Sequence, residues 1–184
     1  MNPQVIAQLI SMRHSPIKNY IVPGLISWLI MDQGGAGKVR MFENTREQHA
    51  FITPHSHRFN FSACVVRGWV ENTSWFRGDT GDDMYRCTGM KYDGEPGKYV
   101  IDNHYHAPFI SDPITHEEGA WYAMKHSEMH SIKFSKGAMV LFFEGPAVTD
   151  TSYTLEPVVD HEYLPTMKTE PWMFKRGENE SSVW

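Results

Sequence analysis

The 184-residue sequence has little cysteine, no excess of basic charge and no long hydrophobic run. Its two cysteines, Cys64 and Cys87, cannot form a disulfide framework, and no CxxC pair indicates a zinc site, which favours a reducing compartment. Lys and Arg number 17 against 22 Asp and Glu, a net charge of −5, which argues against a nucleic-acid partner. The most apolar early segment, residues 21–31, has about half the length of a membrane span and contains Pro23 and Gly24.

The residues that are present favour a single β-domain. Apolar residues make up 41 % and aromatic residues 13 % of the chain, enough for a sizeable core in one domain. Beyond residue 38, short runs rich in β-branched and aromatic residues alternate with turn signals made of Gly, Asp, Ser and Pro. These predicted strands are residues 39–42, 50–53, 59–75, 84–90, 98–101, 120–124, 130–134 and 138–143. Many short strands of this kind are typical of a sandwich or barrel.

The two ends of the chain differ from this middle part. Residues 2–12 place apolar side chains near helical spacing, with Pro3 in the first turn and Pro16 as a stop, and predict a helix. We therefore expect an N-terminal helical arm over 1–38, a barrel over 39–157 and a C-terminal arm or tail over 158–184. No basic segment precedes an apolar one at the N-terminus, so we expect no secretory signal and a cytoplasmic protein.

Histidine is unusually frequent, with ten in the chain. Six of them form three close pairs, which are His55 and His57, His104 and His106, and His126 and His130. In a strand, positions i and i+2 share a face, so an HxH pair points two imidazoles the same way, as a metal site requires. An exposed pair on an edge strand is the plain alternative. For His104 and His106 we favour a polar rim of loop histidines, and for His126 a loop position.

The residues that follow the first pair add to the pattern. A strand-like run after His57 ends at Gly68, and His130 lies far downstream, before a turn and an apolar strand. In these features the sequence resembles the cupin superfamily, in which an HxH motif with a following carboxylate and glycine pairs with a later histidine. The resemblance covers about 39–157 and implies an all-β, cupin-type double-stranded β-helix barrel, with one or two N-terminal helices and a C-terminal arm. It also implies a metal bound by His55, His57 and His130.

One departure from the family pattern concerns the carboxylate. The positions where the family usually places glutamate hold Phe61 and Ser62. Three interpretations stay open: a three-histidine centre with open positions, which is similar to that of thiol dioxygenases; a fourth ligand; or no metal. The candidates for a fourth ligand are Asn60, Ser62, His104 and His106.

The resemblance also bears on the reaction. Three neutral imidazoles leave the metal its full positive charge and favour anionic ligands. We expect a metal-dependent cupin oxygenase that acts on a small polar or anionic molecule, with one divalent transition metal, Fe(II) in the first place and Zn, Ni or Mn as alternatives. A non-catalytic cupin that binds or sequesters a small ligand is one alternative, and a metal-free sugar-nucleotide isomerase with a His base and a Tyr acid is another. Because cupins commonly dimerise, we expect a homodimer, and neither a nucleic-acid nor a membrane partner.

Further site residues follow from strand alternation. Counted from His57, Phe61 faces inward and Arg67 falls on the same face near the barrel mouth, so both are candidates to bind substrate. Tyr122 and His106 are the catalytic candidates. The arginines that have the chemistry to hold an anionic group are Arg40, Arg58, Arg67 and Arg86.

Overall fold

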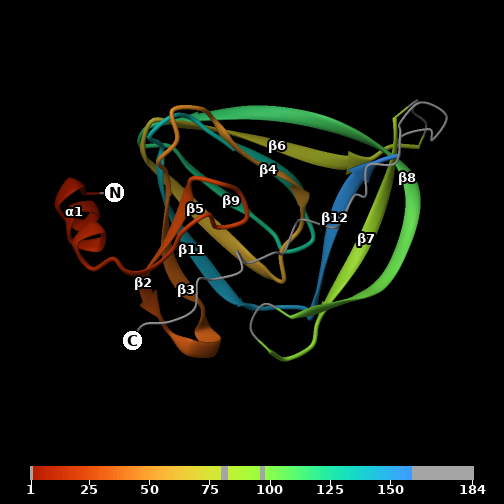
Figure 1. Ribbon diagram of the computed structural model, residues 1–184, viewed down its shortest axis with the longest axis horizontal. Helices are drawn as coiled ribbons and strands as arrows, with labels where there is room; N and C mark the ends of the chain where they lie inside the picture. The colour runs from red at the N-terminus through yellow and green to blue at the C-terminus, as the bar shows by residue number, and fades with distance from the viewer. Residues whose placement is uncertain (1, 80–82, 96–97, 159–184) are drawn as a thin grey trace.

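The computed structural model describes residues 2–79, 83–95 and 98–158. Within these residues one α-helix and one 3-10 helix accompany twelve β-strands (Figure 1). The N-terminal elements are α1 (Pro3–Ser11), β1 (His14–Ile17), β2 (Leu25–Asp32), η1 (Gly34–Ala36) and β3 (Lys38–Asn44). The central strands are β4 (Ala50–His55), β5 (Phe59–Arg67), β6 (Trp69–Arg77), β7 (Met84–Tyr92) and β8 (Tyr99–Glu117). The last strands are β9 (Trp121–Met124), β10 (Met129–Phe134), β11 (Met139–Ala147) and β12 (Thr151–Pro157).

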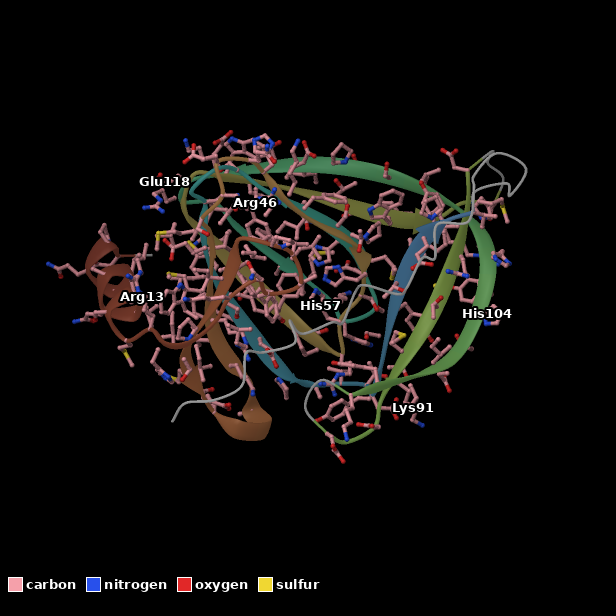
Figure 2. The ribbon with its side chains drawn as sticks, in the orientation of Figure 1. Arg13, Arg46, His57, Lys91, His104 and Glu118 are labelled. Atoms are coloured by element: carbon pink, nitrogen blue, oxygen red, sulfur yellow. The ribbon has the colours of Figure 1, made fainter. Side chains whose placement is uncertain are left out.

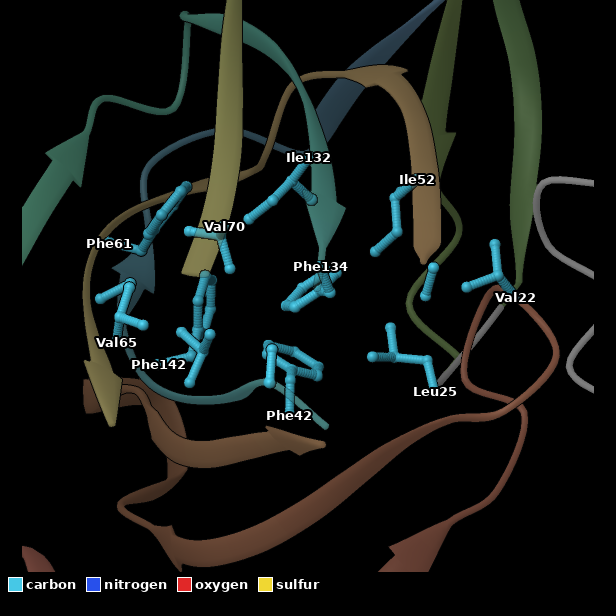
Figure 3. Packing of buried hydrophobic residues seen from close by; sticks show 14 of the residues in the cluster. Val22, Leu25, Phe42, Ile52, Phe61, Val65, Val70, Ile132, Phe134 and Phe142 are labelled. Carbon is cyan, nitrogen blue, oxygen red and sulfur yellow. The ribbon is translucent and has the colours of Figure 1, made fainter. Parts of the chain in front are cut away.

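The strands form two antiparallel sets that face each other. One is a six-stranded sheet in the order β1-β2-β3-β11-β5-β9, and the other is a closed barrel in the order β10-β4-β12-β7-β8-β6. The main hydrophobic core lies between the sheet and the β4, β6 and β10 side of the barrel (Figure 3). Its buried members include Phe42, Phe61, Val65, Ile132 and Phe142. The expected all-β fold with a barrel is confirmed, with one of the expected one or two helices.

Strand β8 is 19 residues long and joins two parts of the molecule. Residues 109–117 pair with β6 beside the main core, whereas residues 99–108 pair with β7. Inside the lobe that β7, β8 and β12 form, a separate cluster buries Cys87, Phe109 and Leu155. The fold therefore has an extra apolar lobe in addition to the sandwich interior.

The N-terminal arm contains less helix than the sequence suggested. Helix α1 begins after Asn2, whose side-chain oxygen accepts a hydrogen bond from the Gln4 amide, and its apolar face packs on the outer side of the sheet through Ile6 and Leu9. Residues 25–32, by contrast, are strand β2. Leu25 is buried in the main core and Ile30 in the cluster under α1, so both faces of this strand are covered. A strand buried on both faces is a continuous apolar run, which periodicity cannot distinguish from a buried helix.

The other expected strands are present, with three changes. The run over residues 59–75 is two strands, β5 and β6, separated by Gly68 with a φ of +74°. Strand β12 was not predicted, and β8 extends far beyond the expected 98–101. Residues 159–184 of the expected C-terminal arm lie outside the described part of the chain.

Gly37 ends the tight connection between β2 and β3. Its φ is +124°, and a Cβ placed there would lie 2.0 Å from the backbone oxygen of Glu144 on β11. Only glycine allows the hairpin to approach β11 this closely. Neither helix in the described residues is long and apolar enough to span a membrane.

Candidate metal centre

Two adjacent strands bring three histidines together. Strands β4 and β10 are antiparallel neighbours, and the Cα of His130 is paired with that of His55. The register shifts between this pair and the next one, Ile132 with Ile52. This irregularity turns His55 toward the same interior that buries Ile52, although the two are three residues apart. His57 follows just past the end of β4.

The three imidazoles converge on one point. One ring nitrogen from each lies within 4.8 Å of the others. The Nε2 atoms of His57 and His130 are 2.9 Å apart. Two imidazoles on one ion, at about 2.0–2.1 Å each, would hold their nitrogens about 2.9–3.4 Å apart for angles between 90° and tetrahedral. The spacing of the His57 and His130 nitrogens therefore fits a shared metal ion.

Hydrogen bonds orient the rings from behind. The Nδ1 of His55 lies 2.8 Å from the carbonyl oxygen of Thr53, which can only accept, so this Nδ1 carries the proton and Nε2 keeps its lone pair. The Nδ1 of His130 lies 2.5 Å from Oδ1 of Asn72 on β6, a buried side chain whose amide nitrogen faces the sulfur of Met124. Such partners behind a metal-ligating histidine fix its tautomer and ring orientation.

Burial keeps the three rings neutral at pH 7. Loss of hydration lowers the pKa of His55, and lowers the pKa values of His57 and His130 well below the ordinary value. The neighbouring imidazoles push the pKa values of His57 and His130 in the same direction, whereas the Thr53 carbonyl partly opposes the shift at His55. Metal ligation requires neutral imidazoles, so the site is prepared to bind a cation.

The three rings border a cavity of about 80 Å³ between the two sheets. Its walls are mostly apolar, and a few polar groups face it from the sheet side. The lining residues are Tyr20, Ile21, Arg40, Phe42, Ile52, His55, His57, Phe59, Phe61, Tyr122, His130, Ile132, Phe134, Val140, Phe142 and Glu144. An apolar cavity with a few converging polar groups is the usual form of a small-molecule site.

Several residues singled out from the sequence lie at this cavity. His55, His57 and His130 are brought together there. Phe61 is buried against two of them, with its ring centroid 4.8 Å from that of His57 and 5.5 Å from that of His130. Tyr122 lines the same space, and burial raises the pKa of its phenol.

Other candidates lie elsewhere. Arg67 is half-exposed at the far end of β5, where it donates to the Gly137 carbonyl and faces Glu43. It shares a strand with Phe61 but lies roughly 20 Å farther along, at about 3.3 Å per residue. His106 is exposed on the part of β8 that pairs with β7, outside the cavity lining.

The proposed fourth ligands do not join the cluster. His104 is exposed on β8 in the outer lobe, whereas His57 lies between the sheet and the barrel (Figure 2). Asn60 accepts hydrogen bonds from His126, in the turn that precedes β10. Neither Asn60 nor Ser62 is among the described residues that line the cavity.

Three further side chains at the histidines or the cavity were not selected as site residues from the sequence. Asn72, Arg40 and Glu144 contact the histidines or line the cavity. Arg40 was one of four arginines with suitable chemistry, and nothing in the sequence selected it. Asn72 and Glu144 carry no local motif.

No family model matches the sequence, and no curated protein matches it either. Among solved structures, the chain is similar to hydroxypropylphosphonic acid epoxidase from S. wedmorenis, with 12% identity, a TM-score of 0.42 and coverage of 73% of this chain and 56% of that one. It is also similar to KdgF from Halomonas sp., with 14% identity, a TM-score of 0.39 and coverage of 72% and 88%. A third similar structure is oxalate decarboxylase from Lactobacillus farciminis, with 15% identity, a TM-score of 0.40 and coverage of 77% of this chain and 33% of that one. The chain thus spans about half the length of the epoxidase.

At these identities and TM-scores the likeness says nothing about the reaction. The topology and the convergent histidines, taken together, define the class of the protein. It is an all-β protein with a closed barrel and a three-histidine centre suited to a divalent metal.

Proposed function

We propose that the chain is a metal-dependent oxygenase that uses Fe(II) and acts on a small polar or anionic molecule. One observation carries the proposal: three neutral imidazoles converge on the edge of a mostly apolar cavity. His55 lies at the end of β4, His57 two residues beyond it, and His130 on β10. No carboxylate oxygen in the described residues joins this group of ligand atoms. An Fe(II) ion held by these three residues would therefore keep its positive charge, which favours an anionic substrate, and would supply the chemistry for reaction with O2.

The chain's own residues would then control access and orientation. Asn72 and the Thr53 carbonyl hold two of the rings from behind, so the lone pairs stay directed at one point. Phe61 and Phe142 pack with their ring centroids 4.5 Å apart and would form an apolar wall beside the histidines.

Tyr122 would act as a hydrogen-bond donor. Burial raises the pKa of its phenol, so the hydroxyl keeps its proton at neutral pH. The ring is held in place by edge contact with Phe61 and by stacking on His116, with centroids 6.2 and 4.6 Å away. A protonated phenol beside a bound substrate can donate to a developing negative charge.

The proposal is tested by metal content and oxygen uptake. Protein purified without an affinity tag is analysed for metals and then supplied with Fe(II) and a panel of small thiols and organic acids under an oxygen electrode. We expect about one iron per chain and oxygen uptake with at least one compound. Zinc at full occupancy with no oxygen uptake would contradict the oxygenase assignment and favour a hydrolytic or ligand-binding role.

The second HxH motif provides a matched control. The double variant His55→Ala/His57→Ala should lose iron and oxygen uptake together. The double variant His104→Ala/His106→Ala removes the same residue types from an exposed strand and should retain both. Equal losses in the two variants would show that the cluster is not the metal centre. The homodimer and the cytoplasmic location stay predictions.

A further inference from the structure

Two charged side chains line the cavity opposite the histidines. Arg40 lies on β3 and Glu144 on β11, which are adjacent strands of the six-stranded sheet. The register pairs Arg40 with Phe142, two residues before Glu144, so the two charges are diagonal neighbours on one face. Diagonal neighbours of this kind lie about 7–8 Å apart between Cα atoms, within reach of two long side chains.

The two charges do not form an ion pair with each other. The Nη1 of Arg40 donates to the Oγ of Ser27 at 3.2 Å, and among the described residues no carboxylate oxygen lies within 4 Å of its nitrogens. No hydrogen bond within the same residues ends on the Glu144 carboxylate. Burial raises the pKa of Glu144, and the charge of Arg40 opposes that shift. Both groups are thus partly desolvated and keep hydrogen-bonding capacity for a third party.

The position of this pair relative to the histidines is set by the sheet. Glu144 is the cross-strand partner of Phe61, and the Phe61 ring contacts His57 and His130. Neighbouring strands are about 4.8 Å apart, so the backbone of Glu144 lies about that far from the backbone of Phe61. Its oxygens are outside the ligand group. A molecule whose donor atom meets the histidines would have its other end beside Arg40 and Glu144.

We propose that Arg40 and Glu144 bind the polar head of the cavity's ligand, which is a small carboxylic acid that also carries an amino or hydroxyl donor. Arg40 holds the carboxylate, and Glu144 accepts a hydrogen bond from the donor. A ligand with only an anionic group would satisfy Arg40 but would be repelled by Glu144, and a simple amine would have the reverse problem. The proposal rests on the proposed function in one respect only, which is that an atom at the other end of the ligand binds the metal.

Three probes that share a hydroxymethyl group separate the two contacts. L-serine carries both a carboxylate and an amino group, 3-hydroxypropionate lacks the amino group, and ethanolamine lacks the carboxylate. Binding to the zinc-loaded protein is measured by titration calorimetry without oxygen chemistry. We expect L-serine to bind about tenfold or more tightly than either truncated probe, as each charged hydrogen bond would require. No measurable L-serine binding, or equal affinity for all three probes, would overturn the proposal.

Two variants assign the contacts to their residues. Arg40→Gln should weaken L-serine binding about tenfold and leave ethanolamine unaffected, whereas Glu144→Gln should weaken L-serine and leave 3-hydroxypropionate unaffected or bound more tightly. Arg67→Gln removes a half-exposed arginine outside the cavity and should change none of these affinities. Unchanged L-serine affinity in Arg40→Gln would refute the assignment. The calorimetry measures binding and does not depend on oxygen uptake, so a negative result in it is distinguishable from a negative result in the oxygenase test.

Discussion

The hydrogen bond between Asn72 and His130 offers the sharpest test of the metal centre. In Asn72→Ala the Nδ1–H of His130 loses its acceptor while the ring stays buried. An unsatisfied buried donor costs about 1–3 kcal/mol, and the ring can escape that cost by turning or changing tautomer, either of which withdraws the Nε2 lone pair. We therefore expect zinc affinity to fall about 10–100-fold, as is usual when the partner behind a ligating histidine is removed.

The assay is competition for zinc against a chromophoric chelator, with circular dichroism as the check on folding. Asn103→Ala is the control, because Asn103 is an exposed residue of β8 whose side chain donates to Asp102, away from the cluster. It should leave zinc affinity unchanged. Asn72→Asp keeps an acceptor at the same place and should restore most of the affinity. If Asn72→Ala binds zinc as tightly as the unchanged chain, the hydrogen bond between Asn72 and His130 does not contribute to metal binding.

Three further outcomes are expected. Because burial lowers the pKa values of the three clustered imidazoles, the unfolded chain binds more protons than the folded one just below about pH 6.5. Urea titrations should therefore show the metal-free protein losing stability as the pH falls below about 6.5, with no further loss below the folded pKa values. Gly37→Ala should lower the melting temperature sharply, because its Cβ would meet the Glu144 backbone at a strained φ, while Gly35→Ala, with nothing within 4 Å, should be tolerated. Tyr122→Phe should keep its metal but reduce oxygen uptake about 100-fold, and unchanged uptake would exclude Tyr122 as a proton donor.

The three histidines could be found in the sequence because their pattern is local and chemical. An HxH pair at a strand end points both rings one way, and a third histidine before an apolar strand fits the family that the pair suggests. The expected inward face of β5 is correct as well, since Phe61, Ala63 and Val65 are all buried in the main core. Alternation within one strand is a property of the backbone and needs no knowledge of neighbours.

The rest of the cavity depends on pairing between strands. Glu144 faces the cavity because β11 is aligned with β5 so that it meets Phe61, and a slip of one residue would turn it to the other face. Asn72 meets His130 only because β6 lies beside β10. Arg67 shows the complementary error: the register of β5 shifts between Val65 and Arg67, so Arg67 lies opposite Met139 and beside Glu43, on the outer face of the sheet. No short segment of sequence contains this information.

The length of β8 has a consequence for how the molecule opens. One unbroken backbone is hydrogen-bonded to β6, which carries Asn72, and also to β7 in the outer lobe. Opening of the lobe would therefore loosen β8, one of the two strands that hold β6 behind the metal centre. Amide hydrogen exchange in β7 should follow global unfolding, and a metal ion on the histidines should slow exchange in a lobe that contributes none of its ligands.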